Sequence, residues 1–161
     1  MRYKILLAGD GGQGIQLMAD IISKTVFQAD LYITSVSNYG LEQRGGASLN
    51  YLQISDKPIG YPKFRKPDLL IVMSKQGRQR TEQNQLPGVE TLNFEYYNGI
   101  LEKENIKSQS LNVLFIGILA KILKEKKICN EKEIFVLLEK RLGKKTNWEE
   151  NKRAFEIGYS K

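Results

Sequence analysis

The sequence predicts an α/β fold, in which helices cover a mostly parallel or mixed sheet and the C-terminal part is helical. Three observations favour this class. The chain opens on the apolar run 3–8, which is typical of a strand in the buried middle of a sheet. A glycine-rich turn and a segment with helical spacing follow at once, and further short apolar runs continue to residue 94. Residues 111–158 contain helix-period segments, so a Rossmann-like three-layer domain is expected.

The expected strands are apolar or β-branched runs that end in turn residues. They cover residues 3–8, 31–37, 47–55, 69–73 and 89–94. A helix over residues 14–27 has apolar residues at helical spacing and joins the first two strands, which are therefore expected to run parallel. The polar residues 74–84 fit a short exposed helix.

Three longer helices are expected in the last third of the chain. The first, over residues 111–126, is apolar nearly all round, so it must be buried on more than one side. Gly143 is expected to stop the second. Capping patterns predict where each helix begins. Ser110 or a neighbour is expected to cap the helix over residues 111–126. Asn130 with Glu133 is expected to open a helix over residues 130–142, and Thr146 with Glu149 one over residues 146–158.

Composition excludes several kinds of site within this chain. It has 161 residues, 41% of them hydrophobic, which suits a single domain over residues 1–161. With Cys129 as its one cysteine and no histidine, it cannot form a disulfide framework, a zinc site, a four-cysteine iron–sulfur cluster or a histidine-dependent catalytic pair. We therefore expect no catalytic residue and no metal site, and a structural thiol at Cys129.

Charge and hydropathy restrict the partners and the compartment. A net charge of +7 fits a solvated lysine-rich face, or an acidic protein partner or anionic substrate tail. Nucleic-acid binding is not expected, because the basic residues are not interleaved with the aromatic residues that such binding would need. The longest apolar stretch, residues 111–123, is too short to span a bilayer. Residues 1–4 lead directly into strand-like sequence, so a signal peptide is not expected. We expect a soluble, cytoplasmic protein.

The turn after the first strand is a candidate anion-binding site. Glycine accepts positive φ and lets a ligand approach the backbone, and the N-terminus of a helix favours negative charge. The spacing matches a dinucleotide-binding fingerprint, but the carboxylate expected near the end of the second strand is missing. A tight turn that packs the helix on the strand explains the glycines equally. The candidate residues are Gly9, Gly11, Gly12, Gln13 and Gly14.

Asp10 within this turn raises a second hypothesis. Asp10, followed by Asn38, has the spacing with which thiamine-diphosphate enzymes hold magnesium, and carboxylate and amide oxygens suit that ion. The chain would then be a free-standing module that binds a nucleotide or thiamine diphosphate with magnesium. A scaffold without a ligand is a further alternative.

Two glycine motifs together carry a family resemblance. Residues 9–15 and residues 40–46, which read Gly-Leu-Glu-Gln-Arg-Gly-Gly, resemble the gamma subunit of the 2-oxoacid:ferredoxin oxidoreductases. That family includes the pyruvate, 2-oxoglutarate and ketoisovalerate enzymes. The resemblance continues in order through residues 54–59, 67–72, 112–120 and 151–159. Leu41 departs from it, since the family usually has proline there, and residues 74–109 match poorly.

The resemblance implies a single pyruvate/ketoisovalerate oxidoreductase gamma-type domain over residues 1–161. Such a chain is a structural, non-catalytic subunit of a complex that oxidatively decarboxylates a 2-oxoacid to an acyl-CoA and reduces ferredoxin. Thiamine diphosphate, magnesium, iron–sulfur clusters and coenzyme A are then held by other subunits. The implied partners are the alpha and beta subunits, a delta subunit where one exists, and ferredoxin indirectly. The isolated chain is expected to self-associate through residues 111–123.

The loop between the second and third expected strands is the candidate subunit interface. It and the first glycine turn lie at strand ends, where open α/β sheets form their binding crevice. Glu42 and Arg44 in this loop are expected either to contact another subunit or to pair with each other and brace the loop. The interface candidates are Gly40, Glu42, Gln43, Arg44, Gly45 and Gly46.

Overall fold

The computed structural model describes residues 1–39 and 45–161. It divides into two compact units, residues 1–94 and 95–161, and each is described by itself. That all 161 residues form one domain stays a prediction.

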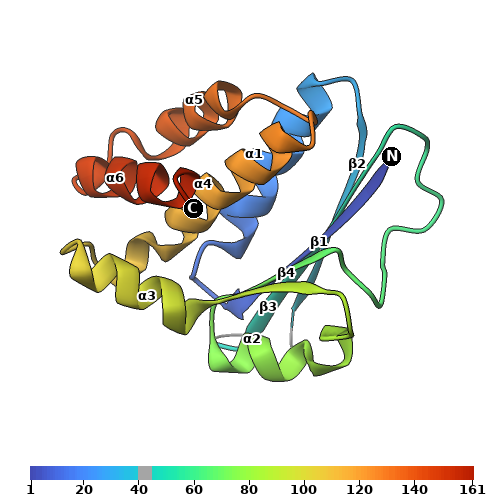
Figure 1. Ribbon diagram of the computed structural model, residues 1–161, viewed down its shortest axis with the longest axis horizontal. Coiled ribbons are helices and arrows are strands. Elements are labelled where there is room, and N and C mark those ends of the chain that lie inside the picture. Colours follow the sequence, from blue (N-terminus) through green and yellow to red (C-terminus); the bar gives the residue numbers. More distant parts are fainter. Residues whose placement is uncertain (40–44) are drawn as a thin grey trace. The chain divides into compact units, whose positions relative to one another are not determined.

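The first unit is built on a five-stranded mixed sheet (Figure 1). The order across the sheet is β2-β3-β1-β4-β5. β3 is antiparallel to both β1 and β2, whereas β4 is parallel to β1 and to β5. The strands are β1 (Arg2–Asp10), β2 (Tyr32–Tyr39), β3 (Ala47–Ser55), β4 (Leu69–Val72) and β5 (Glu90–Asn93). The predicted α/β class and mixed sheet are confirmed. β1 and β2 run in the same direction, as predicted, but β3 lies between them.

Both faces of the central strands are covered, which explains the continuous apolar runs of β1 and β4. All nine residues of β3 and all four of β4 are buried. One face holds a core cluster against which Phe64 packs, with its ring edge-on to Tyr51 at 5.2 Å between centroids. The cluster consists of Leu6, Ala8, Leu49, Tyr51, Leu70 and Val72.

The opposite face of the sheet is covered by α1 (Ile15–Gln28), whose buried side includes Ile15, Met18 and Ile22. Polar side chains meet between α1 and the sheet. Gln16 Oε1 accepts from Ser37 Oγ at 2.8 Å and from Nδ2 of the fully buried Asn50 at 3.3 Å. These bonds hold the start of α1 on β2 and β3.

Residues 74–84 contain the short helix that was expected, α2 (Lys75–Arg80), and a 3₁₀ turn over Glu82–Asn84. The helix α3 (Phe94–Lys103) was missed in the sequence, where this part was left without an element. Its buried residues, Tyr97 and Leu101, are four positions apart, and only this weak periodicity pointed to a helix.

The second unit contains α4 (Leu111–Glu125), α5 (Glu131–Leu142) and α6 (Trp148–Tyr159). Residues 111–120 of α4 are all buried, as its apolar sequence predicted. Because they are buried within the single chain, the expectation that residues 111–123 form a surface for self-association is wrong. α4 and α6 approach at two glycines. A Cβ on Gly117 would overlap the Phe155 carbonyl oxygen, and one on Gly158 would overlap the Leu114 carbonyl oxygen.

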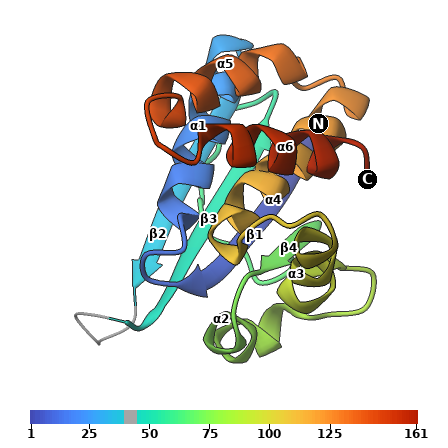
Figure 2. The same ribbon diagram turned by 90° about the vertical axis from the view of Figure 1, so that its left-hand side faces the viewer.

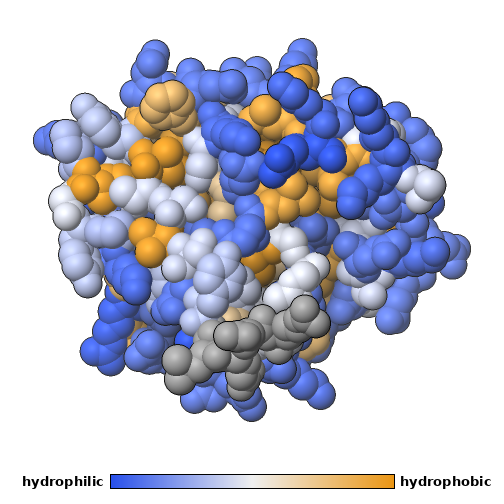
Figure 3. All heavy atoms as spheres, turned by 180° about the vertical axis from the view of Figure 1, so that it is seen from behind, coloured by the Kyte–Doolittle hydropathy of each residue, from blue (hydrophilic) through white to orange (hydrophobic). Residues whose placement is uncertain are grey.

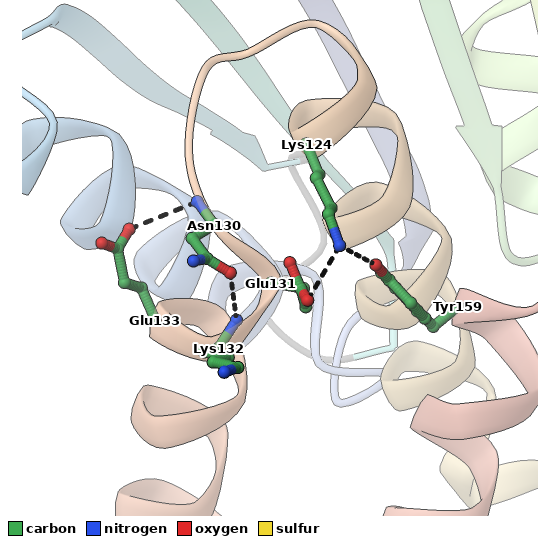
Figure 4. A network of polar contacts seen from close by, with 6 residues as sticks. All are labelled: Lys124, Asn130, Glu131, Lys132, Glu133 and Tyr159. Atoms are coloured by element: carbon green, nitrogen blue, oxygen red, sulfur yellow. Dashed lines mark hydrogen bonds and ion pairs between the residues drawn. The ribbon is translucent and has the colours of Figure 1, made fainter.

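The capping predictions are confirmed for one helix and wrong for two. Asn130 Oδ1 accepts from the Lys132 N–H at 3.1 Å, and Glu133 Oε2 accepts from the Asn130 N–H at 3.4 Å (Figure 4). Ser110 occupies the predicted N-cap position of α4, but its hydroxyl makes no capping bond and instead donates to Asn151 Oδ1 at 2.8 Å. Thr146 does not cap α6, which begins two residues later, after Asn147.

Lys124 links α4, α5 and α6. Its ammonium donates to Tyr159 OH at 2.8 Å and to Glu131 Oε1 at 2.9 Å, as Figure 4 shows. The hydrogen bonds to Tyr159 and Glu131 raise the pKa of Lys124, and the bond from Lys124 lowers the pKa of Glu131. Among the described residues, no helix has the length and apolar character needed to cross a membrane.

Candidate functional site

One edge of the sheet brings most of the predicted site residues together. β1, β4 and β5 are parallel and end at this edge, and β3 begins there, with Ala47 opposite Asp10. The glycine turn 11–14, the start of α2 and residues 45–46 therefore lie side by side (Figure 2). Open α/β sheets bind their ligands or partners at this edge, where parallel strands end.

Glycine is required at two positions of the turn because the backbone is left-handed there. Gly12 has a φ of 90° and Gly14 a φ of 85°. Gly14 is the N-cap of α1, and no side chain caps this end. The first N–H groups of α1 are thus left to solvent or to a ligand, which agrees with the anion-site hypothesis without establishing a ligand.

The two glycine motifs of the sequence are in direct contact. The Gly11 N–H donates to the Gly46 carbonyl oxygen at 3.0 Å. Gly45, with a φ of 77°, also needs the conformational freedom of glycine. The two motifs therefore form one surface rather than two separate sites.

Gln13 braces the turn from inside. Its Oε1 accepts from the Asp10 N–H at 2.8 Å, and its Nε2 donates to the Met73 carbonyl oxygen at 3.2 Å. A Cβ on Gly9 would lie 2.7 Å from that same Oε1. Gly9 and Gln13 thus serve the packing of the turn on β4, which is the second interpretation that the sequence allowed.

Asp10 is bonded to the helix beside it. Ser74 Oγ donates to Asp10 Oδ1 at 2.7 Å and accepts from the Gly77 N–H at 2.9 Å, so Ser74 caps α2 and holds the carboxylate. Asp10 therefore places a carboxylate beside the glycine turn, where it opposes the binding of an anion.

The proposed magnesium ligands do not converge. Asp10 is on β1 and Asn38 on β2, with β3 between them, and their partners on β3 are Ala47 and Leu49. Two strand spacings and two residues along the strand separate their Cα atoms by about 12 Å. Two short side chains cannot both reach one ion over that distance, because Mg²⁺–oxygen bonds are about 2.1 Å long. Asp10 and Asn38 therefore do not fit a site that holds thiamine diphosphate through magnesium.

Three polar residues at this edge were not singled out in the sequence: Ser74, Arg78 and Asn93. The Arg78 guanidinium lies 5.5 Å from the centre of the Phe94 ring and donates to Asn93 Oδ1 at 3.5 Å. Ser74 and Arg78 follow the buried strand β4, and Asn93 ends the parallel strand β5. That position could have identified them. Arg78 gives this edge of the sheet a cation beside the end of β5.

The surroundings of Cys129 agree with the prediction of a structural thiol. Burial, with a smaller effect of the nearby Glu133 carboxylate, raises the pKa of its thiol to about 12. The thiol is therefore protonated at neutral pH and is a poor nucleophile. Within residues 1–39 and 45–161, no group of three or more potential metal-binding side chains occurs.

Of the interface candidates, Gly40, Glu42, Gln43 and Arg44 lie outside the described residues. The structure places Gly45 and Gly46 beside the glycine turn.

The family model for pyruvate ferredoxin/flavodoxin oxidoreductase matches residues 4–91. A curated relative, 2-oxoglutarate synthase subunit KorC of Methanothermobacter marburgensis, is 46% identical over 77 residues, which are 47% of this chain and 41% of that protein. The matched part thus spans less than half the length of this relative.

Solved structures show how far the fold extends. The 2-oxoglutarate:ferredoxin oxidoreductase of Magnetococcus marinus, solved with 2-oxoglutarate, coenzyme A and succinyl-CoA, matches with a TM-score of 0.84 and 18% identity, over 99% of this chain and 30% of that one. The gamma subunit of the keto/oxoacid ferredoxin oxidoreductase of Geobacter sulfurreducens matches with a TM-score of 0.70 and 19% identity, over 98% and 96% of the two chains. The shared fold therefore covers nearly the whole chain.

Proposed function

Because the chain belongs to the pyruvate ferredoxin/flavodoxin oxidoreductase family, we propose that it is the gamma subunit of a 2-oxoacid:ferredoxin oxidoreductase. In this role it is a structural part of a complex that oxidatively decarboxylates a 2-oxoacid to an acyl-CoA and reduces ferredoxin. The observation that carries the proposal is the family match over residues 4–91, which includes both glycine motifs and the strands that hold them. The match of the fold to a gamma subunit over nearly its full length supports it.

The chemistry of the described residues supports a structural rather than a catalytic role. Gln13 and Asp10, the polar residues of the glycine turn, are engaged in contacts that hold the turn together. The Cys129 thiol is protonated at neutral pH. We place thiamine diphosphate, magnesium, the iron–sulfur clusters and coenzyme A on the other subunits, and the complex in the cytoplasm.

The sheet edge that carries both glycine motifs is the proposed contact with the alpha and beta subunits. Its described surface combines the exposed residues Gly11 and Gly12 with the Arg78 side chain, and in the sequence the segment between β2 and β3 adds Glu42 and Arg44. Such a mixture of one acid and two bases suits polar recognition of a partner chain, because charge complementarity fixes the orientation of subunits.

The first experiment tests the function as a whole. The tagged full chain, expressed in its own cells, should co-purify with at least two further chains, and the complex should reduce an artificial acceptor with a 2-oxoacid, coenzyme A and thiamine diphosphate. The chain alone should show no turnover. Steady turnover by the isolated chain, or its purification without any partner, would overturn the proposal.

The second experiment tests the interface. Arg44→Glu should weaken the complex by roughly 2 kcal/mol or more, or about 30-fold, if the reversed charge faces a polar partner at a buried contact. Lys57→Glu is the matched control, because exposed Lys57 follows β3 at the opposite edge of the sheet. Equal recovery of the partner subunits with both variants would remove the interface role of the loop.

A further inference from the structure

β2 forms one edge of the five-stranded sheet, and its outer side has no neighbouring strand in the described part of the chain. An edge strand presents a row of unpaired N–H and C=O groups that can pair with another strand, and proteins usually block such pairing with charges, proline, bulges or short length. The opposite edge is blocked in this way, because β5 has only four residues and begins with Glu90.

β2 has none of these protections. It is eight residues long, and its sequence, Tyr-Ile-Thr-Ser-Val-Ser-Asn-Tyr, contains no charged residue and no proline. Tyr32 is 50% exposed and Tyr39 is 62% exposed. Figure 3 shows the side of the molecule on which β2 lies, where a band of pale and orange side chains interrupts the dark blue surface. A strand rich in β-forming residues is thus open along its full length.

We propose that β2 pairs antiparallel with β2 of a second copy of this chain, so that two five-stranded sheets join into one across a twofold axis. The contact goes beyond the proposed subunit role. It uses the lateral edge strand β2, whereas the glycine motifs lie where the parallel strands end. In such an isologous contact each strand offers the same groups to the other.

The sequence of β2 is self-complementary in one register, and this identifies a second copy as the occupant. When Val36 lies opposite its own symmetry mate, Ile33 faces Tyr39, Thr34 faces Asn38, and Ser35 faces Ser37. Within residues 33–39 every apolar side chain then meets an apolar or aromatic one, and every polar side chain meets a hydrogen-bonding one, which is how cross-strand pairs stabilise a sheet. Centring the axis on Ser35 instead would set Ile33 against Ser37 and Tyr32 against Asn38.

No charged side chain lies in the contact itself. The chain carries a net charge of +7, so two copies repel at long range, but the uncharged β2 keeps that charge out of the contact itself. Salt should therefore preserve or favour the dimer, since it screens the repulsion and leaves the main-chain hydrogen bonds in place. An electrostatic contact would weaken with salt.

The register is tested by disulfide crosslinking in a Cys129→Ser background. Directly opposite Cα atoms in an antiparallel pair are about 4.5–5.5 Å apart, which lies within the range of a disulfide. Val36→Cys should therefore yield a crosslinked dimer on mild oxidation. Thr34→Cys is the matched control on the same strand, because its symmetry mate would lie about 14 Å away, and it should stay uncrosslinked.

The strength of the contact is tested by sedimentation of the full chain over a range of concentrations. Ser35→Lys, at an exposed position of β2, should raise the dimer dissociation constant at least about tenfold, since an edge lysine opposes strand pairing. Gln28→Lys adds the same charge at the exposed end of α1 and should leave the dimer unchanged. A strictly monomeric chain, equal crosslinking of Val36→Cys and Thr34→Cys, or a dimer unaffected by Ser35→Lys would each overturn the proposal. Loss of other subunits from Ser35→Lys, without any dimer in the native chain, would assign the edge to a different partner.

Discussion

Replacing Gly117 by alanine should separate α4 from α6, because no space exists for a methyl group there. A Cβ at this position would overlap the Phe155 carbonyl oxygen and would lie 2.9 Å from the Tyr159 amide nitrogen. The atoms in contact are backbone, which cannot rotate away as a flexible side chain could. The helices would have to move apart by about 1 Å, in an interior that is packed as densely as an organic crystal.

The cost can be worked out from two opposing effects. Overpacking a core by one carbon destabilises by about 1–3 kcal/mol and occasionally more, and the overlap with backbone puts Gly117 at the upper end. Alanine also favours helix over glycine by about 1 kcal/mol, which offsets part of that loss. The net destabilisation should be about 2 kcal/mol or more. For a chain of this size the melting temperature should fall by roughly 4–8 °C.

Thermal and urea unfolding followed by circular dichroism measures this effect. Gly99→Ala is the matched control, because Gly99 lies within a helix of the same unit and a Cβ there would meet nothing within 4 Å. That variant should be stabilised by up to about 1 kcal/mol. If Gly117→Ala melted at or above the native temperature, the close approach of α4 and α6 would be refuted.

Three further predictions concern the glycine-rich edge and the thiol. Gly77→Ala should destabilise by about 1–2 kcal/mol in urea unfolding, because its Cβ would lie 2.8 Å from the Ala8 carbonyl carbon, and a stability equal to the native chain would contradict the packing of α2 on β1. Calorimetry should detect no micromolar binding of thiamine diphosphate with magnesium to the isolated chain, whereas binding that Asp10→Asn or Asn38→Ala abolishes would restore the magnesium hypothesis. Cys129, with its pKa raised to about 12, should be alkylated at pH 8 roughly 100- to 1,000-fold more slowly than a free thiol, and its rate should still rise with pH beyond pH 9.

Local patterns in the sequence were sufficient for most elements. The buried runs in β1 and β4 could be recognised because a strand covered on both faces is apolar throughout. β3 is also buried but contains polar residues, and its β-forming residues indicated the strand. The capping box at Asn130 and Glu133 involves residues three apart, so the sequence contains the whole interaction. α3 was missed because its helical spacing rests on two buried residues.

Other errors arose where a side chain had a partner far away in the sequence. Ser110 looked like a cap, but its hydroxyl bonds to Asn151, 41 residues later. Asp10 and Asn38 looked like a ligand pair, but the strand between them belongs to residues that follow both. No local spacing reveals such partners, since they depend on how distant segments fold back.

The sequence by itself determined the class of fold, the family and the need for glycine at the first turn. Buried strands, helical periodicity and left-handed backbone each have a local signature in the amino-acid sequence. Only the tertiary structure decided what surrounds that turn. It set β3 between β1 and β2, tied Asp10 to Ser74 at the start of α2, joined Gly11 to Gly46, and left β2 at the edge of the sheet. These features follow from the order of strands across the sheet, which is decided by the packing of the whole unit and not by the residues of any one strand.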